Sequence, residues 1–217
     1  MLPEKTVLAF DTSAAHCAAA LLCGERILAR RIEEMAKGQA ERLFGLLEDM
    51  LREGGKGWGD LDAIGVGVGP GNFTGIRISV AAARGLALSL QRPAIGVSTL
   101  EALALDLPRP SLAAVDARRG QIYLQSFGSE AQPAGIFAAD ALPAAYLAHG
   151  PVCVGHDAAN LAATSKGRAM APCHDLPVAI ARITLSRLSN KQPRPAPLYL
   201  RAADAAPSRE PKLVILP

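Results

Sequence analysis

The sequence predicts an α/β fold, and two observations support this. The chain opens on a continuous apolar run from Val7 to Phe10, which is typical of a strand covered on both faces. Two later segments, 37–53 and 76–90, place apolar residues three and four positions apart, as helices do. Because 50% of the residues are hydrophobic and only 20% are charged, the chain can bury a core that a disordered chain lacks.

The first half of the chain carries the clearest patterns. Three successive strand signals, with the turn Gly24–Glu25 between the last two, indicate an antiparallel meander. Gly54–Gly55 ends the first helix, and Ser98 is expected to cap the last one, with Glu101 completing a capping box. The predicted elements are strands over 5–11, 16–23 and 26–33, a helix over 37–53, a strand over 62–68, a helix over 76–90, a strand over 94–97 and a helix over 99–105.

Pro108 and Pro110 mark a boundary within the 217 residues. We therefore expect two domains, an N-terminal one over 1–107 and a smaller, less patterned one over 108–217. Signals beyond the boundary are weaker: strands over 112–115 and 120–127, alternating helix and strand signals over 140–190, and a proline-rich segment from 191 onward.

The helix predicted over 76–90 is apolar on every side, which is typical of a helix that is buried all round. One side can face the sheet. The other side needs a neighbour, either the helix over 37–53 or another protein, and the pattern leaves both open. Small residues at a spacing of four, Ser79, Ala83 and Ala87, would let a partner helix approach closely.

The glycine-rich loop 69–75 lies between a predicted strand and a predicted helix, where backbone amides can bind an anion. The loop lacks the lysine of a P-loop and the spacing of GxGxxG, so a tight structural turn is the favoured interpretation. The segment Asp11-Thr12-Ser13 likewise favours a turn over a metal or phosphate site. The candidate anion or nucleotide site comprises Asp11, Thr12, Gly69, Gly71, Asn72 and Thr74.

Several other functions find little support in the sequence. A net charge of +3 without a dense basic run does not favour tight binding of nucleic acid by the chain alone. The histidines lack HxxxH spacing and no GxSxG occurs, so we expect neither a metal site nor a serine hydrolase. The four cysteines form no CxxC pair and are expected to be buried free thiols. No apolar run approaches the about 20 residues of a membrane span and no signal-peptide pattern occurs, so we expect a cytoplasmic protein without membrane contact.

One group of sequence strings resembles the TsaB (YeaZ) family, and these strings occur in order over nearly the whole chain, although the second half carries fewer of them. The most specific is Gly69-Pro70-Gly71-Asn72-Phe73-Thr74-Gly75-Ile76-Arg77. Departures from the family pattern are small: Asn72 stands where Ser is common, and Gln39-Ala40 where His-Ser is common. The other matching strings are 8–13, 38–43, 60–64, 97–104, 116–118 and the closing Tyr199-Leu200-Arg201.

The resemblance implies the two-domain fold of actin, sugar kinases and heat-shock ATPases, with mixed sheets flanked by helices. It also implies a non-catalytic partner of TsaD, acting with the ATPase TsaE, in forming threonylcarbamoyladenosine beside the anticodon of tRNA. Contact with tRNA would be only indirect, and ATP or ADP would bind, if at all, at the interface of the complex. TsaD-type proteins carry an HxxxH metal motif, and the aligned positions here are Thr99 and Leu103.

Family members pair with TsaD through the two helices of the first domain, as a four-helix bundle. We also expect a homodimer through this face when TsaD is absent. Truncating Leu47, or replacing Ala83 by a large charged residue, is expected to abolish pairing while the monomer stays folded. The expected partner-binding residues are Glu41, Leu43, Phe44, Leu47, Met50, Arg77, Val80, Ala83, Arg84 and Ala87.

The alternative is an enzyme in its own right, a nucleotide-binding, sugar-kinase-like ATPase or phosphotransferase that uses Asp11 and the glycine loop. Calorimetry of the isolated chain with ATP and magnesium would distinguish the two. Peptidase activity is not favoured, because the sequence contains no recognisable nucleophile–base pair and no metal motif.

Overall fold

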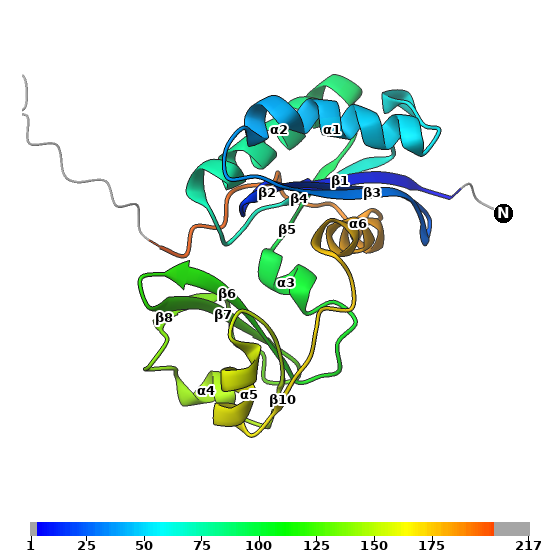
Figure 1. Ribbon diagram of the computed structural model, residues 1–217. Coiled ribbons are helices and arrows are strands. Elements are labelled where there is room, and N and C mark those ends of the chain that lie inside the picture. Colours follow the sequence, from blue (N-terminus) through cyan, green and yellow to red (C-terminus); the bar gives the residue numbers. More distant parts are fainter. Residues whose placement is uncertain (1–3, 202–217) are drawn as a thin grey trace, which may run out of the picture.

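The first of two five-stranded mixed sheets is built from the N-terminal part of the chain (Figure 1). The computed structural model describes residues 4–201. The sheet has the order β3-β2-β1-β4-β5, in which β1, β2 and β3 are antiparallel neighbours and β4 and β5 run parallel to β1. The predicted meander is therefore confirmed. The strands are β1 (Thr6–Asp11), β2 (His16–Cys23), β3 (Arg26–Glu34), β4 (Ala63–Gly67) and β5 (Ala94–Val97).

The second sheet repeats the same plan. Its order is β10-β9-β6-β7-β8, with an antiparallel meander from β6 to β8 and parallel strands β9 and β10 beyond β6. Two mixed sheets of equal topology are the actin and sugar-kinase-like fold that the resemblance implies. The strands are β6 (Ser111–Arg118), β7 (Gln121–Phe127), β8 (Gly135–Ala138), β9 (Val152–Gly155) and β10 (Arg168–Ala169).

Helices cover both sheets in layers (Figure 1). Helices α1 and α2 cover one face of the first sheet, α3 and α6 lie between the sheets, and α4 and α5 cover the far face of the second sheet. A short 3-10 helix, η1, follows α1. The bounds are α1 (Gln39–Glu53), η1 (Trp58–Asp60), α2 (Phe73–Leu90), α3 (Thr99–Leu103), α4 (Ala144–Leu147), α5 (Ala158–Ser165) and α6 (Leu176–Arg187).

The position of α6 differs from the expected division into 1–107 and 108–217. The second sheet does begin just after the expected boundary, at Ser111. However, α6 contacts β1, β2, β4 and β5 of the first sheet. It returns because its apolar side chains, among them Val178, Ile180 and Ile183, bury against the face of the first sheet that α1 and α2 leave open. The part of the chain after 108 is therefore shared between the two sheets.

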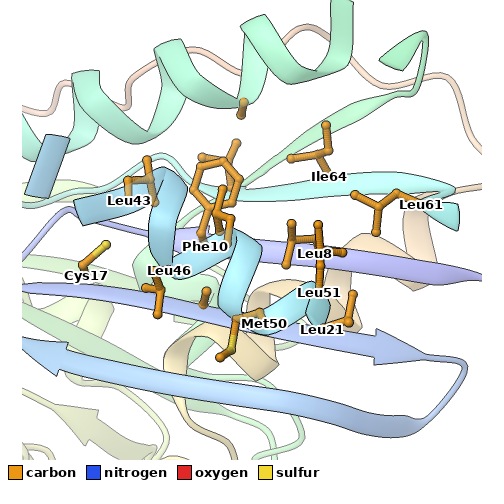
Figure 2. Packing of buried hydrophobic residues seen from close by; sticks show 14 of the residues in the cluster. Leu8, Phe10, Cys17, Leu21, Leu43, Leu46, Met50, Leu51, Leu61 and Ile64 are labelled. Carbon is orange, nitrogen blue, oxygen red and sulfur yellow. The ribbon is translucent and has the colours of Figure 1, made fainter. Parts of the chain in front are cut away.

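The continuous apolar run of β1 is explained by cover on both of its faces. Leu8 and Phe10 face α1 and α2, where they pack with Leu46 and Met50 (Figure 2). The alternate residues, such as Val7, pack against α6 on the opposite face. A strand with two buried faces has no polar alternation, as its sequence indicated.

The start of α2 and the capping box of α3 differ from the predictions. Helix α2 begins at Phe73 and not at Ile76, because the side chain of Asn72 caps it by accepting a hydrogen bond from Gly75 N at 3.0 Å. Ser98 caps α3 as predicted. Glu101 forms no capping box, because its carboxylate pairs with Arg187 of α6.

Candidate functional site

The carboxyl end of β1, with Asp11 and Thr12, meets Gly71 and Asn72 of the glycine-rich loop. The other two residues of the candidate anion site are not placed against Asp11: Gly69 O accepts a hydrogen bond from Thr99 N, and Thr74 is exposed. Asp11 is fully buried, and its Oδ1 accepts hydrogen bonds from Ser13 N and Ser13 Oγ, both at 2.9 Å. His16 Nε2 lies 2.8 Å from the same oxygen. The other oxygen, Oδ2, is buried without a hydrogen-bond partner among the described residues. It lies against Gly67, where a Cβ atom would come within 1.8 Å of it.

The polar groups of the loop are bonded mainly to the protein itself. Thr12 Oγ1 donates to Gly75 O at 2.7 Å, and Asn72 N donates to Ser13 O at 2.6 Å. A Cβ on Gly75 would approach Thr12 O to 1.8 Å, and one on Gly71 would approach Ser13 O to 2.4 Å. Glycine is therefore required here for close contact between α2 and the end of β1. This geometry accounts for the loop as a structural junction, and binding of a nucleotide there stays a prediction.

Half of the expected partner-binding residues lie in the core and not on the surface. Each of them faces the first sheet, so this part of the prediction is corrected. The small-residue row of α2 has the same orientation, since Ser79 Oγ donates to Gly67 O of β4 at 3.2 Å. The core residues, all at most 3% exposed, are Leu43, Leu47, Met50, Val80 and Ala83.

The expectation that changes at Leu47 and Ala83 abolish pairing while the monomer stays folded is therefore wrong as well. Leu47 and Ala83 have no exposed surface. Truncating Leu47 leaves a core cavity, and a charge at Ala83 is buried without a partner, so both changes destabilise the monomer itself. Neither variant can separate pairing from folding.

The remaining expected residues do reach the surface. Glu41, Arg77 and Arg84 are exposed, Phe44 is 47% exposed, and Ala87 is partly buried. These side chains come from α1 and α2 on the side that faces away from the first sheet.

A second set of exposed residues on α2 was not predicted from the sequence. Phe73 is 43% exposed, Leu88 is 82% exposed, and Ala81 and Gly85 are also exposed. With Arg77 they recur every three or four positions, and that spacing was the signal that could have found them. We call Phe73, Arg77, Ala81, Gly85 and Leu88 the outer face of α2.

Helix α2 is accordingly not buried all round, as its sequence had suggested. It is the one helix among residues 4–201 with the length and mean hydropathy that a membrane crossing needs, by those two criteria alone. Only 28% of its residues are buried. It packs on β4 and β5 along one side and presents the outer face on the other.

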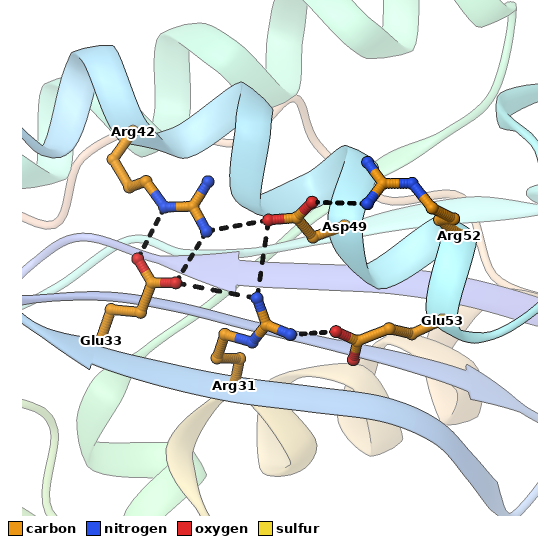
Figure 3. Close-up of polar contacts among 6 residues, drawn as sticks. All are labelled: Arg31, Glu33, Arg42, Asp49, Arg52 and Glu53. Carbon is orange, nitrogen blue, oxygen red and sulfur yellow. Dashed lines mark hydrogen bonds and ion pairs between the residues drawn. The ribbon is translucent and has the colours of Figure 1, made fainter.

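A network of charges fastens α1 to the edge strand β3 (Figure 3). Arg42 of α1 donates to both carboxylate oxygens of Glu33 at 2.7 and 2.8 Å, and to Asp49 Oδ2 at 2.9 Å. Arg31 of β3 lies 3.5 Å from Asp49 and also pairs with Glu53. The hydrogen bonds from Arg42 lower the pKa of Glu33 and of Asp49 below their ordinary values.

This network predicts a loss of stability in acid. Because the pKa of Glu33 is lower in the folded chain than in the unfolded chain, the stabilisation is complete above about pH 4.3 and is lost as the pH falls through the lowered pKa. The free energy of unfolding, measured in urea at pH 7 and pH 3, should fall less in Arg42→Met than in the wild type. The exposed Arg194→Met serves as the control, and equal pH dependence in all three proteins would contradict the assignment.

The thiols differ from expectation at one position. Cys17, Cys23 and Cys153 are buried, but Cys173 is exposed. Burial, assisted by the negative charge of Glu33, raises the pKa of Cys17 to about 11, and burial also raises the pKa of Cys153. Only a thiolate reacts readily.

A disulfide reagent at pH 8 should therefore modify one thiol rapidly in the folded chain and four in denaturant. Cys173→Ser should abolish the rapid reaction, and two rapid thiols in the wild type would contradict this.

Residues 4–201 contain no group of three or more His, Cys, Asp and Glu side chains that could hold a metal ion. The positions that align with the HxxxH motif, Thr99 and Leu103, lie on α3. Two of the remaining histidines are paired with carboxylates: His149 lies 3.0 Å from Glu130, and His174 lies 2.7 Å from Asp106.

Comparison with known proteins relates this chain to one family. Residues 27–146 match the family described as "TsaD: tRNA N6-adenosine threonylcarbamoyltransferase". The Escherichia coli protein named tRNA threonylcarbamoyladenosine biosynthesis protein TsaB is 38% identical over 122 residues, which cover 54% of this chain and 52% of that protein. The chain thus spans about half the length of the curated relatives that carry this name.

Two further relatives match over nearly their whole length. An uncharacterised protein of Mycobacterium tuberculosis is 31% identical over 207 residues, covering 93% of this chain and 94% of that protein. The solved structure described as YeaZ from Pseudomonas aeruginosa has a TM-score of 0.69 at 26% identity, covering 90% of this chain and 100% of that one. The likeness therefore includes the second sheet and α6, where the sequence signals are weak.

Proposed function

Because this chain belongs to the TsaB (YeaZ) family, we propose that it is a non-catalytic partner of a TsaD-type threonylcarbamoyltransferase. In this role it assists the formation of threonylcarbamoyladenosine beside the anticodon of tRNA, together with the ATPase TsaE. The site of this function is the cytoplasm, where tRNA is modified.

The observation that carries the proposal is the exposed outer face of α2. Leu88 is 82% exposed, and Phe44 of α1 is 47% exposed. Large apolar side chains held in water on adjacent helices are typical of a protein-binding surface. The exposed Ala81 and Gly85 lie on the same face of α2 as Leu88 and would let a partner helix approach closely.

The nature of the partner follows from the family match. Residues 27–146, which include both α1 and α2, match a TsaD family, so a TsaD-type protein would present an equivalent helix pair. Two such pairs meeting outer face to outer face would form a four-helix bundle. The same geometry supports a homodimer of this chain when TsaD is absent, which light scattering across a range of concentrations would detect.

The residues present support placing the chemistry in the partner. Thr12 and Asn72 bond to neighbouring backbone groups, and Thr99 and Leu103 stand where the metal motif would be. The charge of +3 supports contact with tRNA through the complex and not through this chain alone.

Reconstitution tests the proposal. Purified TsaD, TsaE and the enzyme that makes the threonylcarbamoyl donor are incubated with tRNA, with and without this chain. We expect the modified nucleoside to form only when the chain is present. Equal product without it would overturn the proposed function.

A further inference from the structure

The last described residues, 195–201, link the two sheets. On the side of the first sheet, Leu198 N donates to Val68 O at 2.8 Å, just after β4. Pro195 is buried and lies against Gly96 of β5, and its carbonyl accepts a hydrogen bond from Arg84 Nε of α2 at 2.7 Å. The Leu198 side chain packs against the core beneath α1 and α2.

The same segment reaches the second sheet within three residues. Leu200 packs against the core cluster of that sheet. Arg201 Nη2 donates to Ala117 O at 2.7 Å and to Gln121 Oε1 at 2.6 Å, at the turn between β6 and β7. Leu198 and Leu200 thus belong to different cores, although only one residue separates them.

That intervening residue, Tyr199, holds the start of α2. Its hydroxyl accepts a hydrogen bond from Arg77 Nε at 2.9 Å, and its ring lies 5.0 Å from the ring of Phe73. The Arg77 guanidinium lies 3.7 Å from the centre of the Phe73 ring. Phe73 and Arg77 are both residues of the outer face of α2, so the segment contacts the proposed partner surface directly.

The position of residues 195–201 allows these contacts to restrain movement of one sheet relative to the other. Between residues 4 and 194 the chain crosses between the sheets twice, from α3 to β6 and from β10 to α6, and both crossings lie on one side of the molecule (Figure 1). Residues 195–201 lie on the opposite side, where the carboxyl ends of β4 and β5 face the β6–β7 turn (Figure 1). Two crossings on one side place any hinge between the sheets on that side. A third link on the other side opposes opening about this hinge, in addition to the packing of α3 between the sheets.

We propose that residues 195–201 form a strap that locks the second sheet to the first, and that this lock holds the start of α2 in its partner-binding position. The closing Tyr199-Leu200-Arg201 string is then a positioning element, and the second sheet contributes to partner binding without touching the partner. The second part of this inference rests on the proposed function.

The test uses Arg201→Ala, which removes only the anchor on the second sheet. The readouts are exchange of the Leu198 amide, which reports opening of the strap from Val68, and the affinity for purified TsaD. Because two hydrogen bonds are lost, we expect Leu198 exchange to accelerate about tenfold and TsaD affinity to fall about fivefold. Tyr199→Phe keeps the ring contact and loses only the hydroxyl. Its Leu198 exchange rate and its TsaD affinity should therefore lie between those of Arg201→Ala and those of the wild type.

Arg194→Ala is the matched control, because this neighbouring arginine is exposed and makes no hydrogen bond or ion pair with other described residues. It should leave both readouts unchanged. The proposal that residues 195–201 lock the two sheets together is overturned if the Leu198 amide exchanges at the same rate in Arg201→Ala as in the wild type. Its positioning role is overturned if exchange accelerates while TsaD affinity stays the same. Failure of the wild-type chain to bind TsaD overturns the proposed function instead, and the exchange experiment still tests the lock.

Discussion

Ala81→Arg is expected to abolish binding of the TsaD-type partner and to leave the chain folded. Ala81 lies at the centre of the outer face of α2, with Arg77 and Gly85 one turn away on either side. In the free chain the new guanidinium extends into water. Between packed helices it would be desolvated without a partner and would hold the helices apart, so we expect affinity to fall about 100-fold or more.

Calorimetry with TsaD measures this loss, and thermal unfolding of the variant checks that the monomer is intact. Ala163→Arg is the matched control, because Ala163 is an exposed alanine of α5 on the second sheet. It should bind TsaD as the wild type does. If Ala81→Arg also binds normally, the outer face of α2 is not the partner surface.

Gly75→Ala is expected to destabilise the chain by about 3 kcal/mol, although alanine ordinarily stabilises a helix relative to glycine by about 1 kcal/mol. The reversal follows from the 1.8 Å distance between a Cβ at this position and Thr12 O. The obstacle is backbone at the end of β1, which cannot turn aside as a side chain can. Relief requires α2 to move away from β1, which would also stretch the hydrogen bond from Thr12 Oγ1 to Gly75 O.

Gly85→Ala, in the same helix, provides the internal control. A Cβ at Gly85 meets no atom within 4 Å, so this variant should be more stable than the wild type by about 0.5–1 kcal/mol. Urea unfolding of both variants at low protein concentration gives the two values. A Gly75→Ala chain as stable as the wild type would show that the loop is not the close-packed junction described above.

The local sequence pattern was sufficient to predict most elements of the first sheet. The strands of the meander and helix α1 were predicted within two residues, because α1 has one clear apolar period and the strands are apolar or alternating segments bounded by turn signals. The second half gave weaker signals, since its strands β8, β9 and β10 have at most four residues and its helices are rich in alanine. A short element carries too few side chains to establish a period.

The candidate site was predicted only in part, for a different reason. Leu43 and Phe44 are neighbours in the sequence and equally apolar, yet one is 1% and the other 47% exposed. Periodicity places both residues on the broad apolar stripe of α1, but it does not say where the edge of that stripe meets the sheet. In α2, whose sequence is apolar on every side, it does not say which face is buried at all. For α2 the small residues Ser79 and Ala83 suggested a partner surface, and in the folded chain they face the core.

By itself, the sequence determined the α/β class, the opening meander, the glycine junction and, through its strings, the family. Each of these depends on residues that are close together along the chain. Only the tertiary structure decided that α6 covers the first sheet, that the outer face of α2 is exposed, and that residues 195–201 link the two sheets. The cover by α6 and the link by residues 195–201 depend on contacts between segments about 80 or more residues apart, such as Arg201 with Ala117. The exposure of the outer face of α2 depends on which side of the helix packs on the neighbouring β4 and β5, and that is decided only when the elements assemble.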